Sequence, residues 1–265
     1  MVGQWRYSAD IGTRAAWAGL VGDDPLGRRL VRQLAERGVD VRWVGSRTDA
    51  PTGVYFKDPG NGVRYYRAGS AASRMDPAFL ESTPLDMARA VHLSGITPAL
   101  SASCDALAEA LVERPRDGSA LVSFDVNHRP ALWAQDAAAE RLRSLAARSD
   151  LVFVGLDEAA ALWGTETPAA VRALLPQPSL LVVKDTAAVA IEFSDAGVAE
   201  VPAFEVEVVE PVGAGDAFAA GYLHALLAGR SPAERLAAGH ARAVTVLGET
   251  ADFPRAERPI TRSTQ

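Results

Sequence analysis

The stretches LVSFDV at 121–126, LVFV at 151–154 and LLVV at 180–183 decide the fold. Each is a short, continuous run rich in Val, Leu and Phe, which is typical of strands that are covered on both faces. Two more strands are predicted at 15–21 and 90–93, and amphipathic stretches predict helices at 25–37, 103–114, 134–148, 157–164 and 168–175. This alternation of strand and helix predicts an α/β fold in which helices cover both faces of a parallel sheet.

The bulk composition is that of a globular protein with an ordinary core. The chain has 265 residues, of which 48% are hydrophobic and 23% charged, enough for one large domain or two small ones. The net charge of −6 argues against nucleic acid or an anionic membrane as a partner. The single cysteine, Cys104, excludes a disulfide framework and a multi-cysteine metal site, and it fits the cytoplasm. No apolar run reaches the roughly 18–20 residues that span a bilayer.

One segment breaks the alternation of strand and helix. Residues 52–68 contain the aromatic runs TGVYF and VRYYR on either side of turn residues, which predicts a β-hairpin. A hairpin inside an α/β alternation is typical of a flap that leaves the main sheet, and an ordinary edge hairpin is the alternative. Tyr65 and Tyr66 alternate along the second strand, so we expect only one of them to face a ligand.

Polar residues follow several of the predicted strands. They are Ser94 to Thr97, Asp125 with Asn127 to Arg129, Asp157 with Glu158, and Lys184 with Asp185. The carboxyl ends of parallel strands meet at one rim of a sheet, where open α/β folds bind their ligands. The sequence therefore predicts a site at this rim.

The segment EPVGAGD at 210–216 carries the chemistry, because it opens a helical stretch predicted at 217–227. Gly213 and Gly215 let the backbone bend tightly and approach a ligand, and the helix start offers free N–H groups to an anion. A carboxylate at Asp216 suits phosphoryl transfer, in which it accepts the proton of the attacking hydroxyl. The alternative is that Asp216 only caps the helix.

Six motifs together resemble the ribokinase/PfkB family of carbohydrate kinases. They are VGDDPLG at 21–27, TGVY at 52–55, YYRAGSA at 65–71, HLSGITP at 92–98, DVNHR at 125–129 and GAGDAFAAG at 213–221. They occur in the family's order and approximate spacing and cover most of the chain. The third and fourth of these motifs, YYRAGSA and the run LSGITPAL, are most similar to the 2-keto-3-deoxygluconate kinases.

The resemblance implies a ribokinase-like three-layer α/β/α sandwich with a mostly parallel central sheet. The kinase domain would cover residues 12–255, with a small β lid inserted at about 50–70 and a tail at 256–265. The implied activity is ATP-dependent phosphorylation of a keto-deoxy sugar acid, most readily 2-keto-3-deoxygluconate to its 6-phosphate. A fructokinase- or ribokinase-type activity on neutral sugars, and an impaired pseudo-kinase that only binds ligand, are the alternatives.

The resemblance also assigns residue roles. Asp216 takes the place of the catalytic base, and the amides of Gly213, Ala214 and Gly215 form the anion hole. The implied substrate-binding residues are Tyr65, Tyr66, Arg67, Ile96, Arg129 and Asp252. The implied nucleotide-binding residues are Asn127, His128, Lys184, Asp185 and Thr186. Glu158 would act on magnesium through water.

The same resemblance implies ATP and Mg²⁺ as cofactors, with a monovalent cation as a further candidate. The partners would be the sugar acid and ATP, and a homodimer through the lid is a further expectation. A guanidinium suits the carboxylate of a sugar acid because its fork makes paired hydrogen bonds, which supports the roles of Arg67 and Arg129.

The sequence departs from the family pattern in three places. Residues 1–11 resemble none of the strand, lid strand and Gly-Gly segment that precede residue 12 in the family. A misassigned start, a fragment or an unusual replacement would each explain this, and a literal truncation is expected to be poorly stable. Thr186 and Val189 stand where the nucleotide loop has glycines, so left-handed backbone there would cost about 1–2 kcal/mol per residue. Gly155 replaces an asparagine.

Overall fold

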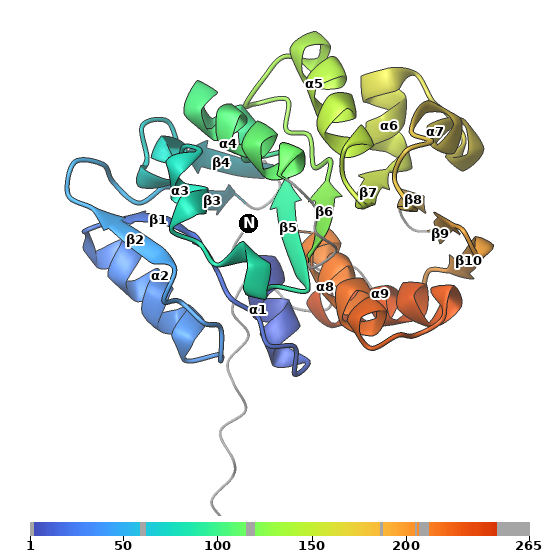
Figure 1. The fold of residues 1–265 in the computed structure, drawn as a ribbon, viewed down its shortest axis with the longest axis horizontal. Helices are drawn as coiled ribbons and strands as arrows, with labels where there is room; N and C mark the ends of the chain where they lie inside the picture. The colour runs from blue at the N-terminus through green and yellow to red at the C-terminus, as the bar shows by residue number, and fades with distance from the viewer. Residues whose placement is uncertain are drawn as a thin grey trace, which may run out of the picture.

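The computed structural model describes residues 3–58, 62–114, 120–185, 188–204, 206 and 212–247. Within these residues six strands form the main sheet, in the order β10-β9-β8-β7-β6-β5 (Figure 1). They are β5 (Ala90–Ser94), β6 (Leu121–Asp125), β7 (Leu151–Gly155), β8 (Leu180–Asp185), β9 (Val189–Ser194) and β10 (Gly197–Pro202). The first four are parallel, while β9 and β10 run antiparallel to their neighbours. The predicted mostly parallel sheet is confirmed.

Helices cover both faces of this sheet. One face carries α4 (Ala102–Glu113), α5 (Gln135–Ala147), α6 (Leu156–Trp163) and α7 (Pro168–Leu174), and the other carries α8 (Ala214–Leu227) and α9 (Pro232–Leu247) (Figure 1). Strand β7 shows why: Val152 and Val154 are buried in one apolar cluster, whereas Leu151 and Phe153 are buried in the cluster that includes α8. A strand that alternates between two apolar layers has no polar face. The three-layer α/β/α architecture is confirmed.

The first part of the chain forms a smaller parallel sheet. Strand β1 (Gly19–Gly22) pairs with β2 (Val44–Arg47), and α2 (Pro25–Ala35) connects them. Among the described residues this pair is not hydrogen-bonded to the six-stranded sheet. Asp24 caps α2 by accepting a hydrogen bond from the amide of Gly27, at 2.8 Å, with Pro25 at the first helical position. Gly38 has a φ of +79°, as expected of a residue that follows the end of a helix.

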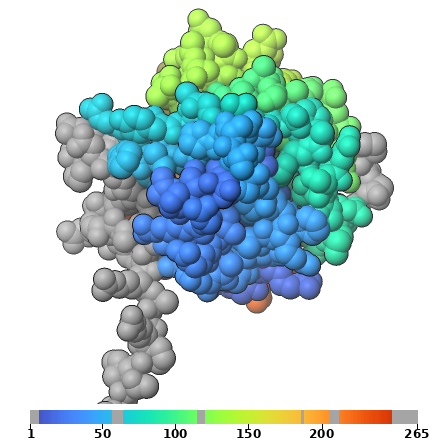
Figure 2. Space-filling view, turned by 90° about the vertical axis from the view of Figure 1, so that its left-hand side faces the viewer, coloured from blue at the N-terminus to red at the C-terminus, as the bar shows by residue number. Residues whose placement is uncertain are grey.

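The predicted hairpin forms a separate two-stranded sheet. Strands β3 (Val54–Asp58) and β4 (Gly62–Tyr66) pair antiparallel and lie outside the six-stranded sheet. The alternative of an ordinary edge hairpin is therefore wrong for the main sheet. In Figure 2 the part of the chain from α2 to this hairpin (blue to cyan) fills much of the face toward the viewer. Short helices follow it: η1 (Ala71–Arg74), α3 (Ala78–Glu81), η2 (Leu85–Met87) and η3 (Pro98–Leu100).

The N-terminal segment is helical where we expected an atypical stretch. Helix α1 (Gly3–Asp10) packs against α8, and the buried Tyr7 lies in a cluster with Ala217, Ala220 and Val246. Asp10 at its end forms an ion pair with Arg242 of α9, at 2.7 Å. Helix α1 is therefore packed against the helical layer formed by α8 and α9. The predicted tail at 256–265 lies outside the described residues, and among those described no helix is both long and apolar enough to traverse a bilayer.

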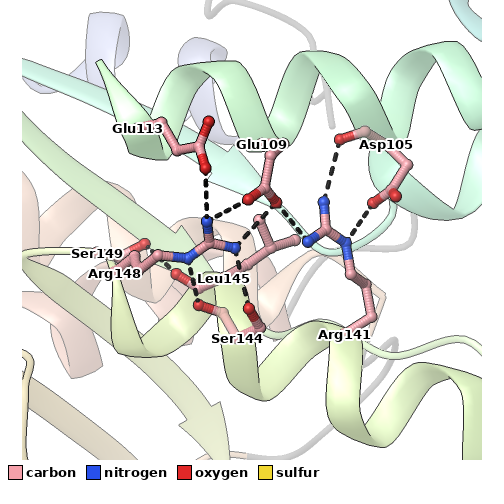
Figure 3. A network of polar contacts seen from close by, with 8 residues as sticks. All are labelled: Asp105, Glu109, Glu113, Arg141, Ser144, Leu145, Arg148 and Ser149. Atoms are coloured by element: carbon pink, nitrogen blue, oxygen red, sulfur yellow. Dashed lines mark hydrogen bonds and ion pairs between the residues drawn. The ribbon is translucent and has the colours of Figure 1, made fainter.

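Helices α4 and α5 are joined by a network of charged side chains (Figure 3). Arg141 donates to Asp105, at 2.6 Å, and also to Glu109. Arg148, about two helical turns beyond Arg141 and just after the end of α5, donates to Glu109 and lies 3.5 Å from Glu113. Glu109 thus stands between two guanidinium groups and ties the two helices together on the outer surface of this layer.

Candidate active site

The turn at Gly213 presents free amides at the start of α8. Gly213 is the N-cap residue and has a φ of +95°, a left-handed conformation that favours glycine. The amides of Ala214 and Gly215, in the first turn of the helix, have no acceptor within it, and the helix dipole adds positive potential there. The turn can therefore bind an anion.

Asp216 lies in this first turn with its carboxylate available. The capping position belongs to Gly213, and in the described part of the chain no hydrogen bond to another residue occupies the Asp216 side chain. The side chain is half-buried and close enough to Arg67 and His92 to affect their titration. The alternative of a simple helix cap is therefore wrong, and the carboxylate is placed to accept a proton from a ligand beside the free amides.

The lid brings a guanidinium to this carboxylate. Arg67 follows β4, and its guanidinium carbon lies 4.2 Å from the centre of the Tyr65 ring. Burial lowers the pKa of Arg67, the nearby Arg129 lowers it further, and Asp216 acts in the opposite direction. Arg67 therefore lies within electrostatic reach of Arg129 and Asp216, two residues that are distant from it in sequence.

The two lid tyrosines face opposite ways, as the alternation predicts. Tyr65 contacts Tyr55, with ring centres 6.0 Å apart, on the face that carries Arg67. Tyr66 is 62% exposed on the other face, where its ring packs edge-on against Phe56 at 5.7 Å. Strand pleating thus turns Tyr66 to the face opposite Tyr65, and its role in substrate binding stays a prediction.

A second charged group lies at the carboxyl ends of β6 and β8. The Lys184 ammonium is 3.8 Å from Oδ1 of the buried Asp125. The same ammonium is 3.7 Å from the position that a Cβ on Gly215 would take, so it lies beside the amides of the turn. Sequence reasoning placed both residues at the rim but did not pair them, because the contact joins strands that are 59 positions apart. Asp125 thus holds the Lys184 ammonium beside the anion site and partly balances its charge.

Glu158 is a buried carboxylate in the same region. Its oxygens accept hydrogen bonds from the amide of His128 and, at 3.3 Å, from the amide of Gly155. Burial, followed by the nearby negative charge of Asp125, raises the pKa of Glu158 to about 7, although Lys184 and the two amides oppose the shift. A cation brought close to Glu158 would therefore stabilise its ionised form.

The loop after β6 holds three further predicted residues. Asn127 has a φ of +41°, a left-handed conformation that asparagine tolerates better than most residues. The Nε2 atom of His128 is buried without a partner among the described residues, whereas the Arg129 guanidinium donates to the His128 carbonyl at 2.9 Å. This hydrogen bond holds the Arg129 guanidinium against the backbone of its own loop.

Of the other predicted site residues, the structure describes some and leaves others out. Ile96 is buried just after β5, and its amide donates to Oγ of Ser94 at 3.2 Å. Asp185 ends β8. Thr186 and Asp252 lie outside the described residues. The expected strain at Val189 is wrong, because Val189 begins β9 and pairs with Asp185 in the ladder instead of forming a left-handed turn.

Sequence reasoning missed Tyr7, which touches the anion turn from α1. Its hydroxyl lies 3.0 Å from the position that a Cβ on Gly213 would take, and the side chain is only 4% exposed. The Arg242 guanidinium lies over the Tyr7 ring at 5.4 Å. An aromatic residue in a short stretch without a matching motif gave no signal of this contact, which depends on how α1 packs against α8.

Comparison with known proteins agrees with this arrangement. A profile of the pfkB family of carbohydrate kinases matches residues 4–253. The chain is 37% identical over 252 residues to a 2-dehydro-3-deoxygluconokinase of Thermoproteus tenax, covering 91% of this chain and 76% of that protein. The crystal structure of a PfkB protein from Polaromonas sp. JS666 superposes with a TM-score of 0.85 at 33% identity, over 93% of this chain and 84% of the other. An aminoimidazole riboside kinase from Salmonella enterica, solved with aminoimidazole riboside and an ATP analogue, gives 0.82 at 25% identity, over 94% and 84%. The chain therefore belongs to the pfkB family of carbohydrate kinases.

Proposed function

We propose that this kinase transfers the γ-phosphoryl group of ATP to the 6-hydroxyl of 2-keto-3-deoxygluconate, also called 2-dehydro-3-deoxygluconate. The observation that carries the proposal is that Arg67, stacked on the Tyr65 ring of the lid, lies within electrostatic reach of both Arg129 and Asp216. Two guanidinium groups that repel one another are best stabilised by an anion between them, and the carboxylate of a sugar acid is such an anion. The name of the Thermoproteus tenax relative supports the same substrate.

The geometry suits in-line phosphoryl transfer from ATP to an alcohol. Asp216 would accept the proton of the sugar hydroxyl, and the amides of Gly213, Ala214 and Gly215 would hold the negative charge of the transferring phosphoryl group. The Lys184 ammonium, 3.7 Å from the Cβ position on Gly215, would add positive charge on the same side. Positioning and charge stabilisation are the main contributions that a protein makes to this reaction.

The residues also fit magnesium that arrives with the nucleotide. Among the described residues no group of three or more His, Cys, Asp or Glu side chains is placed to hold a metal ion directly. Glu158 is a buried carboxylate with a raised pKa, and each of its oxygens keeps a lone pair for a water bound to the ion. Bound Mg²⁺ would neutralise charge on the ATP phosphates. A monovalent cation near the turn stays a prediction.

The nucleotide is proposed to bind at the rim formed by the ends of β6 and β8. Asn127, His128, Lys184 and Asp185 lie there, and Thr186 follows in the sequence. The ATP analogue in the Salmonella enterica kinase supports ATP as the phosphoryl donor. We also propose a homodimer formed through the exposed face of the lid, where Phe56 and Tyr66 pack together. The cytoplasm stays the predicted location.

The substrate class is tested by replacing Arg67 with leucine. ADP release is measured with 2-keto-3-deoxygluconate and with fructose as a neutral competitor, for the wild type and for Arg67→Leu. Because the site would lose a partner for the carboxylate only, we expect kcat/KM for the acid to fall by roughly 10²-fold or more and that for fructose to change little.

The matched control for this test is Arg64→Leu, at an exposed residue of β4 three positions before Arg67. It should leave the acid preference unchanged. An equal loss for the acid and the neutral sugar in Arg67→Leu would contradict the sugar-acid assignment and favour a neutral sugar. No turnover of either substrate by the wild type would contradict the kinase activity itself.

A further inference from the structure

Residues of the VGDDPLG motif form a junction with Thr52. This junction holds the root of the lid, which is the stretch of chain just before β3. Thr52 lies two residues before β3, and its amide donates to Oδ2 of Asp24 at 2.7 Å. The Thr52 hydroxyl donates to Oδ1 of Asp24 at 2.9 Å and accepts from the amide of Gly22 at 2.9 Å. Thr52 is thus fixed through both its backbone and its side chain.

Asp24 holds the lid and a helix with the same carboxylate. Besides its two bonds to Thr52, it accepts the amide of Gly27 in the first turn of α2, at 2.8 Å. The hydrogen bond from Gly27, followed by that from the Thr52 amide, lowers the pKa of Asp24. The ionised carboxylate therefore uses both oxygens and joins the residues before β3 to α2, an element outside the hairpin.

The junction leaves no room for side chains at its two glycines. A Cβ on Gly22 would lie 2.3 Å from Oδ2 of Asp24 and 2.6 Å from the Thr52 nitrogen. A Cβ on Gly27 would lie 2.3 Å from the Gly22 carbonyl oxygen and 2.7 Å from the Thr52 hydroxyl. Such close packing restricts the backbone at residue 52 to one arrangement.

The second leg of the lid is tied to the same place. After β4 the chain turns back, and the amide of Ala71 donates to the carbonyl of Pro51, the residue before Thr52, at 2.8 Å. Between the two legs, Ser70 comes within 3.3 Å of the Cβ position on Gly53. The direction in which the hairpin leaves the body is therefore set at residues 51–53 and 70–71, and Arg67 and Tyr65 lie a few residues beyond.

We propose that Asp24 and Thr52 are positioning residues for the sugar-acid pocket, which fix the root of the lid so that Arg67 and Tyr65 face Asp216. This inference rests on the proposed function for its kinetic consequence only. Loss of the junction would let the hairpin take other directions, and Arg67 would spend less time near the substrate carboxylate. Binding of ATP would be unaffected, because Lys184 belongs to β8 in the main sheet and not to the lid.

The test compares Thr52→Val, which keeps the shape but loses the hydroxyl, with Thr52→Ser, which keeps the hydroxyl. Two hydrogen bonds are lost in the first variant, so we expect KM for 2-keto-3-deoxygluconate to rise about tenfold or more, while KM for ATP stays within about twofold of the wild type. Thr52→Ser should restore the wild-type KM. Thr167→Val is the matched control, since Thr167 caps α7 with the same kind of bond, to the amide of Ala170 at 3.1 Å, far from the lid in the sequence.

Hydrogen exchange of the β3–β4 amides gives a second measurement that needs no substrate. Thr52→Val should speed exchange over residues 54–66, whereas Thr167→Val should not. Unchanged sugar KM with unchanged lid exchange in Thr52→Val would overturn the inference, as would an equal rise of KM for sugar and ATP. If the wild type proves inactive on the sugar acid, the proposed function fails, and faster lid exchange in Thr52→Val alone still supports the junction.

Discussion

At the scale of single residues, the site depends on contacts that hold one turn of backbone. Gly213 has a left-handed φ of +95°, and Tyr7 from α1 lies against it, with its hydroxyl 3.0 Å from the Cβ position. Free amides stabilise a transferring phosphoryl group only if they point at it, and a shift of about 1 Å can cost 10²-fold in rate. We therefore expect Tyr7 to affect catalysis through the turn and not through the substrate.

Replacing Tyr7 with alanine should lower kcat more than it changes either KM. The vacated space lets Gly213 relax, so we expect kcat to fall by roughly tenfold to a hundredfold. Steady-state kinetics measures this, with Leu223→Ala as the control, because Leu223 is buried on the same helix in a different cluster. A Tyr7→Ala enzyme that is less stable than the wild type but has the same kcat would show that Tyr7 only packs.

At the scale of elements, the network between α4 and α5 links stability to pH (Figure 3). The hydrogen bond from Arg148, assisted by Arg141, lowers the pKa of Glu109 to about 2. Since the unfolded pKa is about 4.3, this group stabilises the fold above that pH, and its contribution is lost as the pH falls toward 2. The partly exposed position limits the effect to about 1 kcal/mol.

Glu109→Gln should therefore lower the free energy of unfolding by about 1 kcal/mol at pH 7, with a smaller loss at pH 3. Urea unfolding at the two pH values measures both. Glu113→Gln is the control, because the Glu113 side chain is 61% exposed and 3.5 Å from Arg148, and it should have a smaller effect. A difference between Glu109→Gln and wild type that stays constant from pH 7 to pH 3 would contradict the pKa argument.

The elements also show what the sequence could predict. Strands β5 to β8 were predicted to within about two residues at their ends, because continuous apolar runs identify strands buried on both faces. Strand β9 was missed because it buries Glu192, whose partners Tyr222, at 2.7 Å, and Arg235, at 3.0 Å, are about 30 and 43 positions away. Long-range partners leave no local pattern in the sequence.

The same limit applies to the candidate site. The motif GAGD predicted a helix start with Asp216 in its first turn, because glycines and a helix start are local features. The inward orientation of Tyr65, the contact of Lys184 with Asp125 and the position of Tyr7 depend on how separate elements pack. Those features needed the three-dimensional structure.

At the scale of the whole molecule, the lid has an apolar outer face. Phe56 is 61% exposed and Tyr66 is 62% exposed, and their rings contact each other on the face opposite Tyr65. A two-stranded sheet is only marginally stable by itself. Covering its exposed aromatic rings with another surface would bury apolar area and stabilise it. A second copy of the chain would supply that cover if the protein is a homodimer through the lid.

Phe56→Asp should therefore shift the protein from dimer to monomer. A charge at the centre of an apolar interface is costly, so we expect the dimer dissociation constant to rise by roughly tenfold or more. Sedimentation velocity over a concentration series measures this, and Val198→Asp, at an exposed apolar residue on β10, is the control. A wild type that sediments as a monomer, or a Phe56→Asp dimer as tight as the wild type, would contradict the predicted interface.

The most direct measurement of the central claim is single-turnover phosphorylation of 2-keto-3-deoxygluconate by wild type and by Asp216→Asn, at saturating ATP and Mg²⁺. Asparagine keeps the shape of the side chain but cannot accept the proton. The account predicts 6-phosphate formation by the wild type and a rate about 10²–10⁴-fold lower in the variant, with ATP binding retained. An unchanged rate in Asp216→Asn would contradict the role of this carboxylate as the base.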